Sequence, residues 1–255
     1  MYLTDTHAHL NMDVFLDDRD KIIERAHKEN VKYIVNVGYD IESSQESLYL
    51  SKDYESIYVA VGIHPHNAKD VEKGYIGKLR DLAKNDKVRA IGEIGLDYYR
   101  DISPRDLQRE IFIEQLELAV SLDLPVIIHQ REAERDVISI INSYKKRLKG
   151  GIFHAFSGVE EFLSDYINID FYYGIGGVIT YKNANKLRNI VKKLPIERLL
   201  VETDCPYLTP VPFRGKRNEP SFIKFIRDHL SLVLGISIDE VNNILYKNTK
   251  RILNI

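Results

Sequence analysis

The sequence predicts an α/β protein built as a single (β/α)8 barrel, with a C-terminal helix that closes the outer layer. Three observations predict this fold class. Short apolar runs rich in β-branched residues alternate with longer amphipathic stretches to the end of the chain. The runs are mostly continuous, as in parallel strands that are covered on both faces. About eight such pairs fit into 255 residues, which is the usual size of this barrel.

Each apolar run has the length of a buried strand. Because the carboxyl ends of parallel barrel strands converge on one rim, the residues that follow these runs are expected to lie near one another. An open doubly wound sheet is the alternative arrangement of the same elements. The predicted strands are Tyr2–His7, Lys32–Val37, Ile57–Val61, Arg89–Ile94, Pro125–His129, Gly151–His154, Phe171–Gly174 and Leu199–Glu202.

Helices are predicted between the strands, where apolar residues recur at helical spacing. Before the longest connecting helix, Ser103 is the expected N-cap and Pro104 the first helical residue. The last helix has Ile238 and Val241 among its apolar residues and is expected to pack on the strands. The predicted helices are Asp18–Asn30, Ile41–Ser51, Val71–Asn85, Pro104–Leu122, Ala133–Lys149, Val159–Tyr166, Lys182–Lys193, Ser221–Leu230 and Ser237–Leu253.

We expect one domain over residues 1–255, because no composition shift, linker or repeated motif marks a second one. The proline-rich, basic stretch Pro206–Pro220 follows the last predicted strand and is interpreted as one long loop. The glycine-rich run Tyr173–Gly177 lacks the spacing and the Lys-Ser/Thr ending of a phosphate-binding loop. It is interpreted as strand-end packing with a close approach of the backbone.

Composition excludes several classes of protein. Hydrophobic residues make up 44% of the chain and charged residues 29%, which allows a buried core and argues against extensive disorder. No apolar run approaches the roughly 20 residues of a membrane helix, and the N-terminus lacks a signal-peptide pattern. The single cysteine, Cys205, cannot form an internal disulfide, so we expect a cytoplasmic protein. No obligate protein partner is evident.

Histidine is the most informative residue type. Of eight histidines, only His27 and His229 fall in predicted helices. The others lie at or just past predicted strand ends, and they are His7, His9, His64, His66, His129 and His154. Acidic residues at these ends are Asp5, Glu93, Asp97, Glu202 and Asp204. Burying so many polar rings without partners would cost too much free energy, so the pattern indicates a metal site at the barrel mouth.

The motif Thr-His-Ala-His at residues 6–9 is the sharpest signal. Strand side chains at i and i+2 share a face, so His7 and His9 can point into the mouth and bind one ion. Imidazole is a good ligand for borderline divalent metals. The structural alternative is a chance pair of histidines at a strand end.

Further strand-end residues complete the candidate set. Glu93 lies beside glycines, and its two carboxylate oxygens can bridge two ions. His129 and His154 each offer a ring nitrogen to a second ion. Asp204 can bind a metal and accept a proton from an attacking water, and Glu202 is interpreted as support behind it. The structural alternatives are a salt bridge for Glu93, hydrogen-bonded core positions for the histidines and a turn for Asp204.

Six motifs occur at these strand ends. They are Thr4-Asp-Thr-His-Ala-His-Leu10, Gly62-Ile-His-Pro-His66, Ile91-Gly-Glu-Ile-Gly-Leu-Asp-Tyr98, Pro125-Val-Ile-Ile-His129, His154-Ala-Phe-Ser-Gly158 and Glu202-Thr-Asp-Cys-Pro-Tyr-Leu208. Together they resemble the TatD family of metal-dependent deoxyribonucleases, which belongs to the amidohydrolase-like barrel superfamily. The resemblance extends through the loop that begins at Arg214 and therefore covers nearly the whole chain.

The resemblance implies a ligand set and an activity. The implied metal ligands are His7 and His9 for one ion, His129 and His154 for the other, a bridging Glu93, and Asp204 as the last ligand. Glu93 and Asp204 are the expected catalytic residues, with Asp204 as the general base. The implied reaction is hydrolysis of phosphodiester bonds by a metal-activated water. The family acts as a 3′–5′ exonuclease on single-stranded DNA, and sometimes on RNA.

The implied cofactor is a pair of divalent metal ions. Three or more histidine ligands favour Zn²⁺ or Mn²⁺ over the harder Mg²⁺. The family is nevertheless usually described as Mg²⁺-dependent in nuclease assays. The identity of the metal therefore stays open among Mg²⁺, Mn²⁺ and Zn²⁺.

Substrate contacts are expected from loops at the barrel mouth, because a formal net charge of −2 excludes a general electrostatic attraction to nucleic acid. His64 matches the substrate-side histidine of the family. Arg214, Tyr207 and Tyr98 are the other expected contacts, since arginine binds phosphate bidentately and tyrosine stacks on unpaired bases. Further loop candidates are Tyr99, Arg100, Arg131, Lys216 and Arg217. The alternative is a solvated charged loop.

Two other functions are consistent with the same barrel. One is hydrolysis of cyclic amides, lactones or phosphotriesters, but the sequence shows no evident strand-end lysine that would become a carboxylated metal bridge. The other is a non-catalytic binding protein or scaffold, which would be expected to have lost at least one ligand. All six candidate ligands are present.

Overall fold

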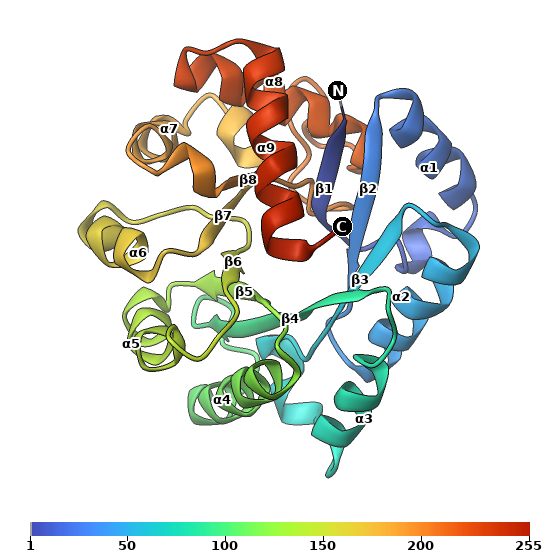
Figure 1. The fold of residues 1–255 in the computed structure, drawn as a ribbon, viewed down its shortest axis with the longest axis vertical. Coiled ribbons are helices and arrows are strands. Elements are labelled where there is room, and N and C mark those ends of the chain that lie inside the picture. Colours follow the sequence, from blue (N-terminus) through green and yellow to red (C-terminus); the bar gives the residue numbers. More distant parts are fainter. Residues whose placement is uncertain (1) are drawn as a thin grey trace. The chain divides into compact units, whose positions relative to one another are not determined.

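Strand pairing follows the order of the chain. In the computed structural model, which describes residues 2–255, eight strands form one parallel sheet in the order β1 to β8 (Figure 1). This order confirms the predicted (β/α)8 class and excludes the doubly wound sheet, in which the strand order reverses. The strands are β1 Leu3–Ala8, β2 Val31–Val37, β3 Ile57–Val61, β4 Val88–Asp97, β5 Val126–Arg131, β6 Gly151–Phe153, β7 Tyr172–Ile175 and β8 Leu199–Val201.

An α-helix connects each strand to the next, and two more follow β8. No helix within residues 2–255 is both long and apolar enough to cross a bilayer. The α-helices are α1 Arg19–Lys28, α2 Ile41–Asp53, α3 Tyr75–Leu82, α4 Arg105–Leu122, α5 Glu134–Tyr144, α6 Leu163–Ile169, α7 Asn185–Val191, α8 Ile223–Leu234 and α9 Ile238–Leu253. The short 3-10 helices are η1 Asp13–Phe15, η2 Pro65–Asp70, η3 Glu160–Phe162, η4 Gly177–Thr180, η5 Ile196–Arg198 and η6 Pro220–Phe222.

The described chain forms two compact units, each assembled from separate stretches of sequence. The first unit comprises the N-terminal stretch to Asn36 together with Ala155–Leu163 and Tyr173–Ile255. The second comprises Val37–His154 and Ser164–Tyr172. Because both units draw on distant parts of the chain, neither is a continuous domain, and the single domain over residues 1–255 stays a prediction.

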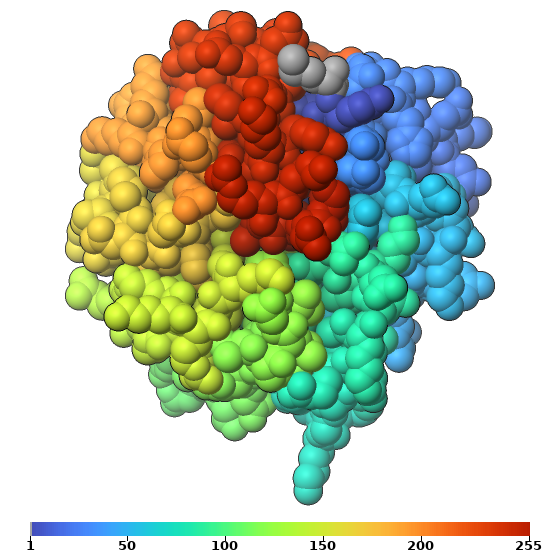
Figure 2. Space-filling view, in the orientation of Figure 1, coloured from blue at the N-terminus to red at the C-terminus, as the bar shows by residue number. Residues whose placement is uncertain are grey.

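In the first unit, the C-terminal helix α9 lies beside β1 and β8 (Figure 1). Val241 is buried there, and Asn248 Nδ2 donates to the carbonyl oxygen of Leu199 at 2.8 Å. In the space-filling view, α8 and α9 form one continuous outer surface (Figure 2). The helix therefore packs on the strands as predicted, except that Ile238 is 44% exposed because it begins the helix.

In the second unit, two buried glutamines of α4 hold the strand ends that carry candidate residues. Gln115 accepts from the N–H of Ile63 at 2.7 Å and donates to the carbonyl of the same residue at 3.1 Å. Gln108 accepts from the N–H of Asp97 at 2.8 Å. Because buried backbone groups need partners, these two amides fix the end of β4 and the loop that follows β3.

The predicted ends of two central strands were too early. β4 continues past Ile94 to Asp97, and β5 continues past His129 to Arg131. The two strands remain paired over this extension, with Asp97 opposite Arg131. Backbone pairing therefore extends the strands beyond the apolar run that marks them in the sequence.

Ser103 does not cap α4, contrary to the prediction. The cap position is Pro104, and no side chain caps it. The Ser103 hydroxyl instead donates to the carbonyl of His66 at 2.8 Å and accepts from the N–H of Lys69 at 3.1 Å. It therefore stabilises η2, the short helix that follows His64.

Several other helices are shorter than predicted, since apolar spacing alone does not mark where a helix begins or ends. α3 begins at Tyr75, directly after Gly74, which has a φ of 88°. α5 ends at Tyr144 rather than Lys149, and the helix expected from Val159 begins as a 3-10 turn. The stretch 206–219 contains neither helix nor strand, which confirms the predicted long loop.

The glycine-rich run Tyr173–Gly177, at the end of β7, packs closely, as predicted. A Cβ on Gly174 would lie 2.1 Å from a carboxylate oxygen of Glu202. A Cβ on Gly177 would lie 1.9 Å from the carbonyl oxygen of Leu208. Both approaches are too close for any side chain, so glycine is required at these positions.

Candidate metal centre

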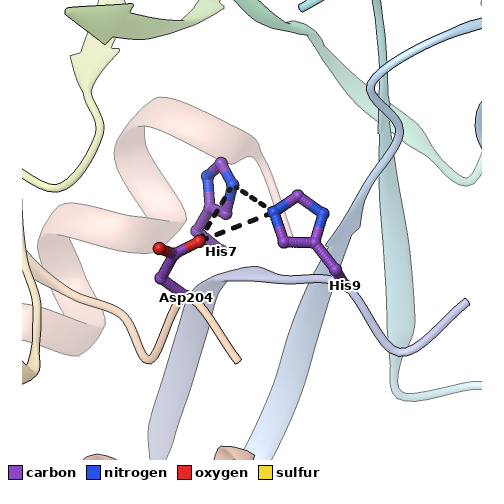
Figure 3. Close-up of side chains that lie close together, drawn as sticks. All are labelled: His7, His9 and Asp204. Carbon is purple, nitrogen blue, oxygen red and sulfur yellow. Dashed lines mark hydrogen bonds and ion pairs between the residues drawn. The ribbon is translucent and has the colours of Figure 1, made fainter. Parts of the chain in front are cut away.

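In the first unit, His7, His9 and Asp204 form a group that we term the His7 cluster (Figure 3). The Nε2 atoms of His7 and His9 lie 3.2 Å apart, and Asp204 Oδ1 lies 3.9 and 3.5 Å from them respectively. Two ligands of one tetrahedral ion, each bound at 2.0–2.1 Å, lie about 3.3 Å apart. The donor set and its spacing therefore fit one divalent cation.

The main chain holds the His7 cluster together. His9 follows the end of β1, and its N–H donates to the carbonyl of Cys205 at 2.9 Å. The N–H of Asp204 donates to the carbonyl of His7 at 2.9 Å. Asp204 has a φ of 56°, a left-handed conformation that aspartate tolerates better than most residues. These bonds turn the carboxylate of Asp204 toward the two imidazoles.

The side chain of Asp5 accepts hydrogen bonds from the backbone that carries the His7 cluster. Its Oδ1 accepts from the N–H of Thr203 at 2.9 Å and from the N–H of His7 at 3.3 Å. Its other oxygen lies 2.5 Å from the Thr203 hydroxyl. Complete burial raises the pKa of Asp5 to about 7, although the hydrogen bonds from Thr203 oppose the shift. Asp5 therefore braces the backbone of β1 and the segment after β8.

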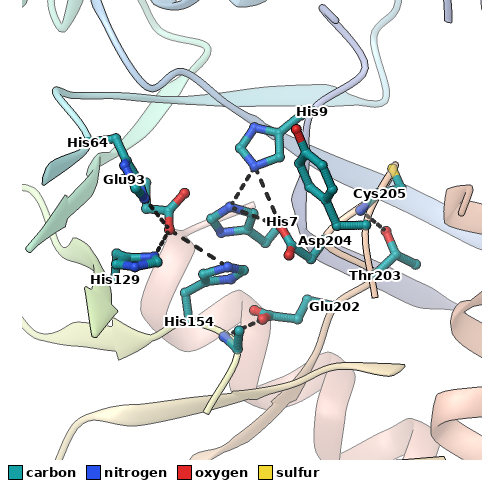
Figure 4. Close-up of polar contacts among 12 residues, drawn as sticks. His7, His9, His64, Glu93, His129, His154, Glu202, Thr203, Asp204 and Cys205 are labelled. Atoms are coloured by element: carbon teal, nitrogen blue, oxygen red, sulfur yellow. Dashed lines mark hydrogen bonds and ion pairs between the residues drawn. The ribbon is translucent and has the colours of Figure 1, made fainter. Parts of the chain in front are cut away.

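In the second unit, Glu93 of β4 lies among three imidazoles, and we term Glu93, His64, His129 and His154 the Glu93 cluster (Figure 4). Glu93 Oε1 lies 2.7 Å from His129 Nδ1. It lies 3.7 Å from His64 Nε2 and from His154 Nε2. A buried carboxylate facing several ring nitrogens is a donor set suited to a divalent cation.

Asp97, at the end of β4, lies behind His129. Its Oδ2 lies 3.0 Å from His129 Nε2 and 2.9 Å from His66 Nε2. Burial alone would raise the pKa of Asp97, but the hydrogen bonds from the two histidines hold it below its ordinary value. Burial alone would lower the pKa of His129, but its hydrogen bonds with Asp97 and Glu93 raise it, so the two carboxylates fix the orientation of the ring from both nitrogens.

His64 has a different role from the other imidazoles of the Glu93 cluster. Its Nδ1 accepts from the N–H of His66 at 3.1 Å. Burial, followed by repulsion from His129, lowers the pKa of His64 well below its ordinary value, so the ring is neutral. The hydrogen of a neutral ring whose Nδ1 accepts must be on Nε2. His64 therefore offers a hydrogen-bond donor rather than a metal-binding lone pair.

Glu202 lies behind the strand ends in the first unit. Its side chain is fully buried, and Oε1 accepts from the N–H of Ala155 at 2.6 Å (Figure 4). Ala155 has a φ of 43°, so the turn that follows His154 depends on this hydrogen bond. This contact is consistent with the supporting role expected for Glu202.

Two expected substrate contacts lie in the loop after β8. Tyr207 is 51% exposed, and its ring centroid lies 6.4 Å from that of His9. The Arg214 guanidinium lies 4.4 Å above the ring of Tyr181. Tyr207 is therefore beside the His7 cluster, and Arg214 is held at the surface by an aromatic ring that sequence reasoning had not singled out.

Tyr98 is already engaged by the protein. Its hydroxyl donates to Asp136 at 2.6 Å and accepts from Arg109 at 2.9 Å, and the Arg105 guanidinium lies 4.4 Å above its ring. Arg217, another loop candidate, pairs with Asp18 at 2.6 Å. The structure thus brings neither side chain into a cluster.

Asp97 is the residue whose contribution sequence reasoning missed. From the sequence, Asp97 was identified only as one of five acidic residues at strand ends, and no role was assigned to it. Side chains at i, i+2 and i+4 share a face of a strand, so its spacing from Glu93 could have placed it beside the same imidazoles. The same rule places Tyr98 on the opposite face.

Comparisons with known proteins agree with this geometry. A model of the family described as TatD related DNase matches residues 4–254. The chain is 42% identical over 253 residues to the uncharacterized metal-dependent hydrolase YabD of Bacillus subtilis (strain 168), covering 99% of both chains. It is 33% identical over 257 residues to the 3'-5' ssDNA/RNA exonuclease TatD of Erwinia tasmaniensis, covering 98% of this chain and 99% of the relative.

A solved structure is similar over nearly the whole length. The crystal structure of YJJV, a TatD homolog from Escherichia coli K12, gives a TM-score of 0.93 at 30% sequence identity. The match covers 99% of this chain and 98% of that chain. It confirms the fold class independently of the strand order.

Proposed function

The chain belongs to the TatD-related DNase family and is a metal-dependent hydrolase, and we propose that it acts as a 3′–5′ exonuclease on single-stranded DNA and RNA. The observation that carries the proposal is the pair of histidine- and carboxylate-rich clusters at strand ends. The name of the Erwinia tasmaniensis relative supports the substrate class. Phosphodiester hydrolysis suits such sites because the reaction develops negative charge that cations neutralise.

We assign one divalent ion to each cluster. His7, His9 and Asp204 would hold the first, and Glu93, His129 and His154 would hold the second. Each cluster lies at or just past the carboxyl ends of its strands, which is where enzymes of this architecture carry their catalytic residues. Bound there, the ions would supply Lewis acidity that activates a water molecule and neutralises the phosphate. The imidazole content favours Mn²⁺ or Zn²⁺.

The side chains of the clusters supply proton transfer and orientation. The carboxylate of Asp204 accepts the proton of the attacking water as general base. The Nε2–H of His64 donates to a non-bridging phosphate oxygen. Arg214 and Tyr207 would bind the substrate outside the clusters, the first through phosphate and the second through stacking on a base.

A labelled-end assay tests the proposal. Oligonucleotides labelled at the 5′ end are expected to shorten progressively with Mg²⁺, Mn²⁺ or Zn²⁺, and 3′-labelled ones are expected to release the label at once. Glu93→Gln should abolish both signals, whereas Glu117→Gln, which removes the charge of a surface carboxylate paired with Arg147, should not. Hydrolysis of cyclic amides without cleavage of oligonucleotides would instead favour another activity of the same superfamily.

A further inference from the structure

Two exposed side chains of the second unit stack beyond the Glu93 cluster. Arg131 is the last residue of β5, and its guanidinium carbon lies 3.9 Å from the centroid of the Tyr99 ring. Tyr99 follows the end of β4 and is 55% exposed. The contact is a cation–π stack at a strand end, and it leaves part of the aromatic ring open to solvent.

The guanidinium of Arg131 has hydrogen-bonding capacity to spare. Within residues 2–255, its side chain makes no hydrogen bond and no ion pair. Stacking occupies the face of a guanidinium and leaves the N–H groups at its edge available. Arg147 provides the contrast, because it lies over Tyr144 but donates to both oxygens of Glu117, at 2.9 and 2.6 Å. The charge of Arg131 has no such partner.

Asp97 connects this pair to the Glu93 cluster. Its Oδ1 accepts from the N–H of Tyr99 at 3.1 Å, while its Oδ2 lies 3.0 Å from His129 Nε2. Arg131 lies opposite Asp97 in the paired strands, and its carbonyl accepts from the N–H of Tyr98 at 2.9 Å. One buried carboxylate therefore fixes the position of the stacked pair relative to the imidazole of His129.

We propose that Tyr99 and Arg131 form a nucleotide subsite beside the Glu93 cluster. The edge of the guanidinium binds a backbone phosphate bidentately, and the open part of the Tyr99 ring stacks on the neighbouring base. The base must be unpaired, because in a duplex both faces of a base are covered by its neighbours. This inference rests on the proposed function and adds to it the residues that select single-stranded substrate.

Two matched substrates distinguish base stacking on Tyr99 from phosphate binding by Arg131. One substrate is a single-stranded oligonucleotide, and the other is the same oligonucleotide with abasic residues near the 3′ end. Tyr99→Ala should raise KM about ten-fold for the normal oligonucleotide, since stacking on one aromatic ring has roughly that effect. Tyr99→Phe, which keeps the ring, should restore KM. Neither variant should change KM for the abasic substrate or kcat for either.

Arg131→Gln should act on both substrates, because both keep their phosphates. The substitution should raise KM. It should also reduce the slope of log KM against log salt concentration by about 0.7, the value for one phosphate contact on a single strand. Arg147→Gln removes the same charge from a stacked arginine elsewhere in the unit and should leave both quantities unchanged. Tyr49→Ala is the aromatic control, since Tyr49 is exposed on α2 beside Lys52.

The outcomes distinguish the subsite from the exonuclease activity. Equal effects of Tyr99→Ala on normal and abasic substrates would overturn the stacking role, and an Arg131→Gln variant that behaves like Arg147→Gln would overturn the phosphate contact. If the parent protein does not hydrolyse oligonucleotides, the exonuclease function fails, but binding of a fluorescent oligonucleotide to the metal-loaded protein still tests the subsite. Weaker binding in Arg131→Gln supports it, and unchanged binding contradicts it.

Discussion

The His7 cluster and the Glu93 cluster are held in place by different parts of the protein. In the His7 cluster, backbone hydrogen bonds from His9 and Asp204 position the ligand-bearing residues. In the Glu93 cluster, a carboxylate oxygen faces three imidazoles, and a second carboxylate, that of Asp97, holds His129 from behind. The first cluster depends on backbone geometry, whereas the second depends on a network of side chains.

This difference predicts how each cluster responds to substitution. A side-chain network loses its geometry when one member changes, because the tautomer and orientation of an imidazole depend on its partner. A cluster held by backbone hydrogen bonds keeps its geometry when a neighbouring side chain is substituted. It loses that geometry when a substitution removes a hydrogen bond that holds the loop carrying its residues. The predictions below use this contrast, from the largest expected effect to the smallest.

Asp204→Asn should lower kcat for oligonucleotide hydrolysis by about 10²–10⁴-fold, the usual contribution of a positioned general base. KM should change little, because the amide keeps the shape of the side chain. The measurement is steady-state kinetics on the metal-loaded variant. Wild-type kcat in that variant would show that Asp204 is not the base.

Asp97→Asn should weaken metal binding at the Glu93 cluster roughly 10–100-fold, the usual effect of removing a carboxylate behind a histidine ligand. Asp5→Asn should have far less effect on the His7 cluster, because the asparagine keeps an Oδ1 that accepts from the same backbone N–H groups. Metal titration of the two variants measures the contrast. Asp136→Asn, which removes a carboxylate charge beside Tyr98 and Arg109, controls for the loss of a carboxylate. Equal losses in Asp5→Asn and Asp97→Asn would contradict the distinction.

Asn218→Ala should lower the free energy of unfolding by about 1–3 kcal/mol, since it removes the donor to the buried carbonyl group of Thr203. Asn218 Nδ2 donates to the carbonyls of Thr203 and Tyr207, at 2.8 and 2.6 Å. These residues flank Asp204, so the variant should also weaken the His7 cluster and leave the Glu93 cluster unchanged. Denaturant unfolding and metal titration test this, with Asn85→Ala as the exposed control. Unchanged stability would argue against a backbone-held cluster.

The Cys205 thiol should be almost unreactive in the native protein. It is completely buried, and burial raises its pKa well above the ordinary value, which suppresses the reactive thiolate. A thiol reagent should therefore modify it only after unfolding in denaturant. Rapid modification of the native protein would show that the segment beside Asp204 opens easily.

The sequence predicted the architecture well where apolar runs are continuous. Ile57–Val61 matches β3 at both ends, because this mostly buried apolar run begins after the polar residue Ser56 and ends before Gly62. The sequence-based predictions were wrong where strand pairing or loop contacts determine the end of a strand or the role of a side chain. β4 continues to Asp97 through pairing with β5, and Ser103 stabilises η2 instead of capping α4.

The candidate ligands were predictable because side chains at i and i+2 share a face of a strand, and the structure brings His7 and His9 together although His9 lies just past the end of β1. The contacts that orient these ligands could not be predicted, because they depend on which strands are neighbours and on the register of their pairing. Only the pairing of β4 with β5 brings Asp97 to His129, and only the loop after β8 carries Arg214 to Tyr181. Sequence patterns identify the ligands, and tertiary structure identifies what orients them.

Metal titration of the metal-free protein tests the central claim most directly. Isothermal titration with Mn²⁺ or Zn²⁺ should reveal about two binding sites per chain, as expected for a two-metal hydrolase. His9→Asn should remove one of them and His129→Asn the other, each leaving about one. Unchanged stoichiometry in both variants, or no binding by the parent protein, would contradict the account.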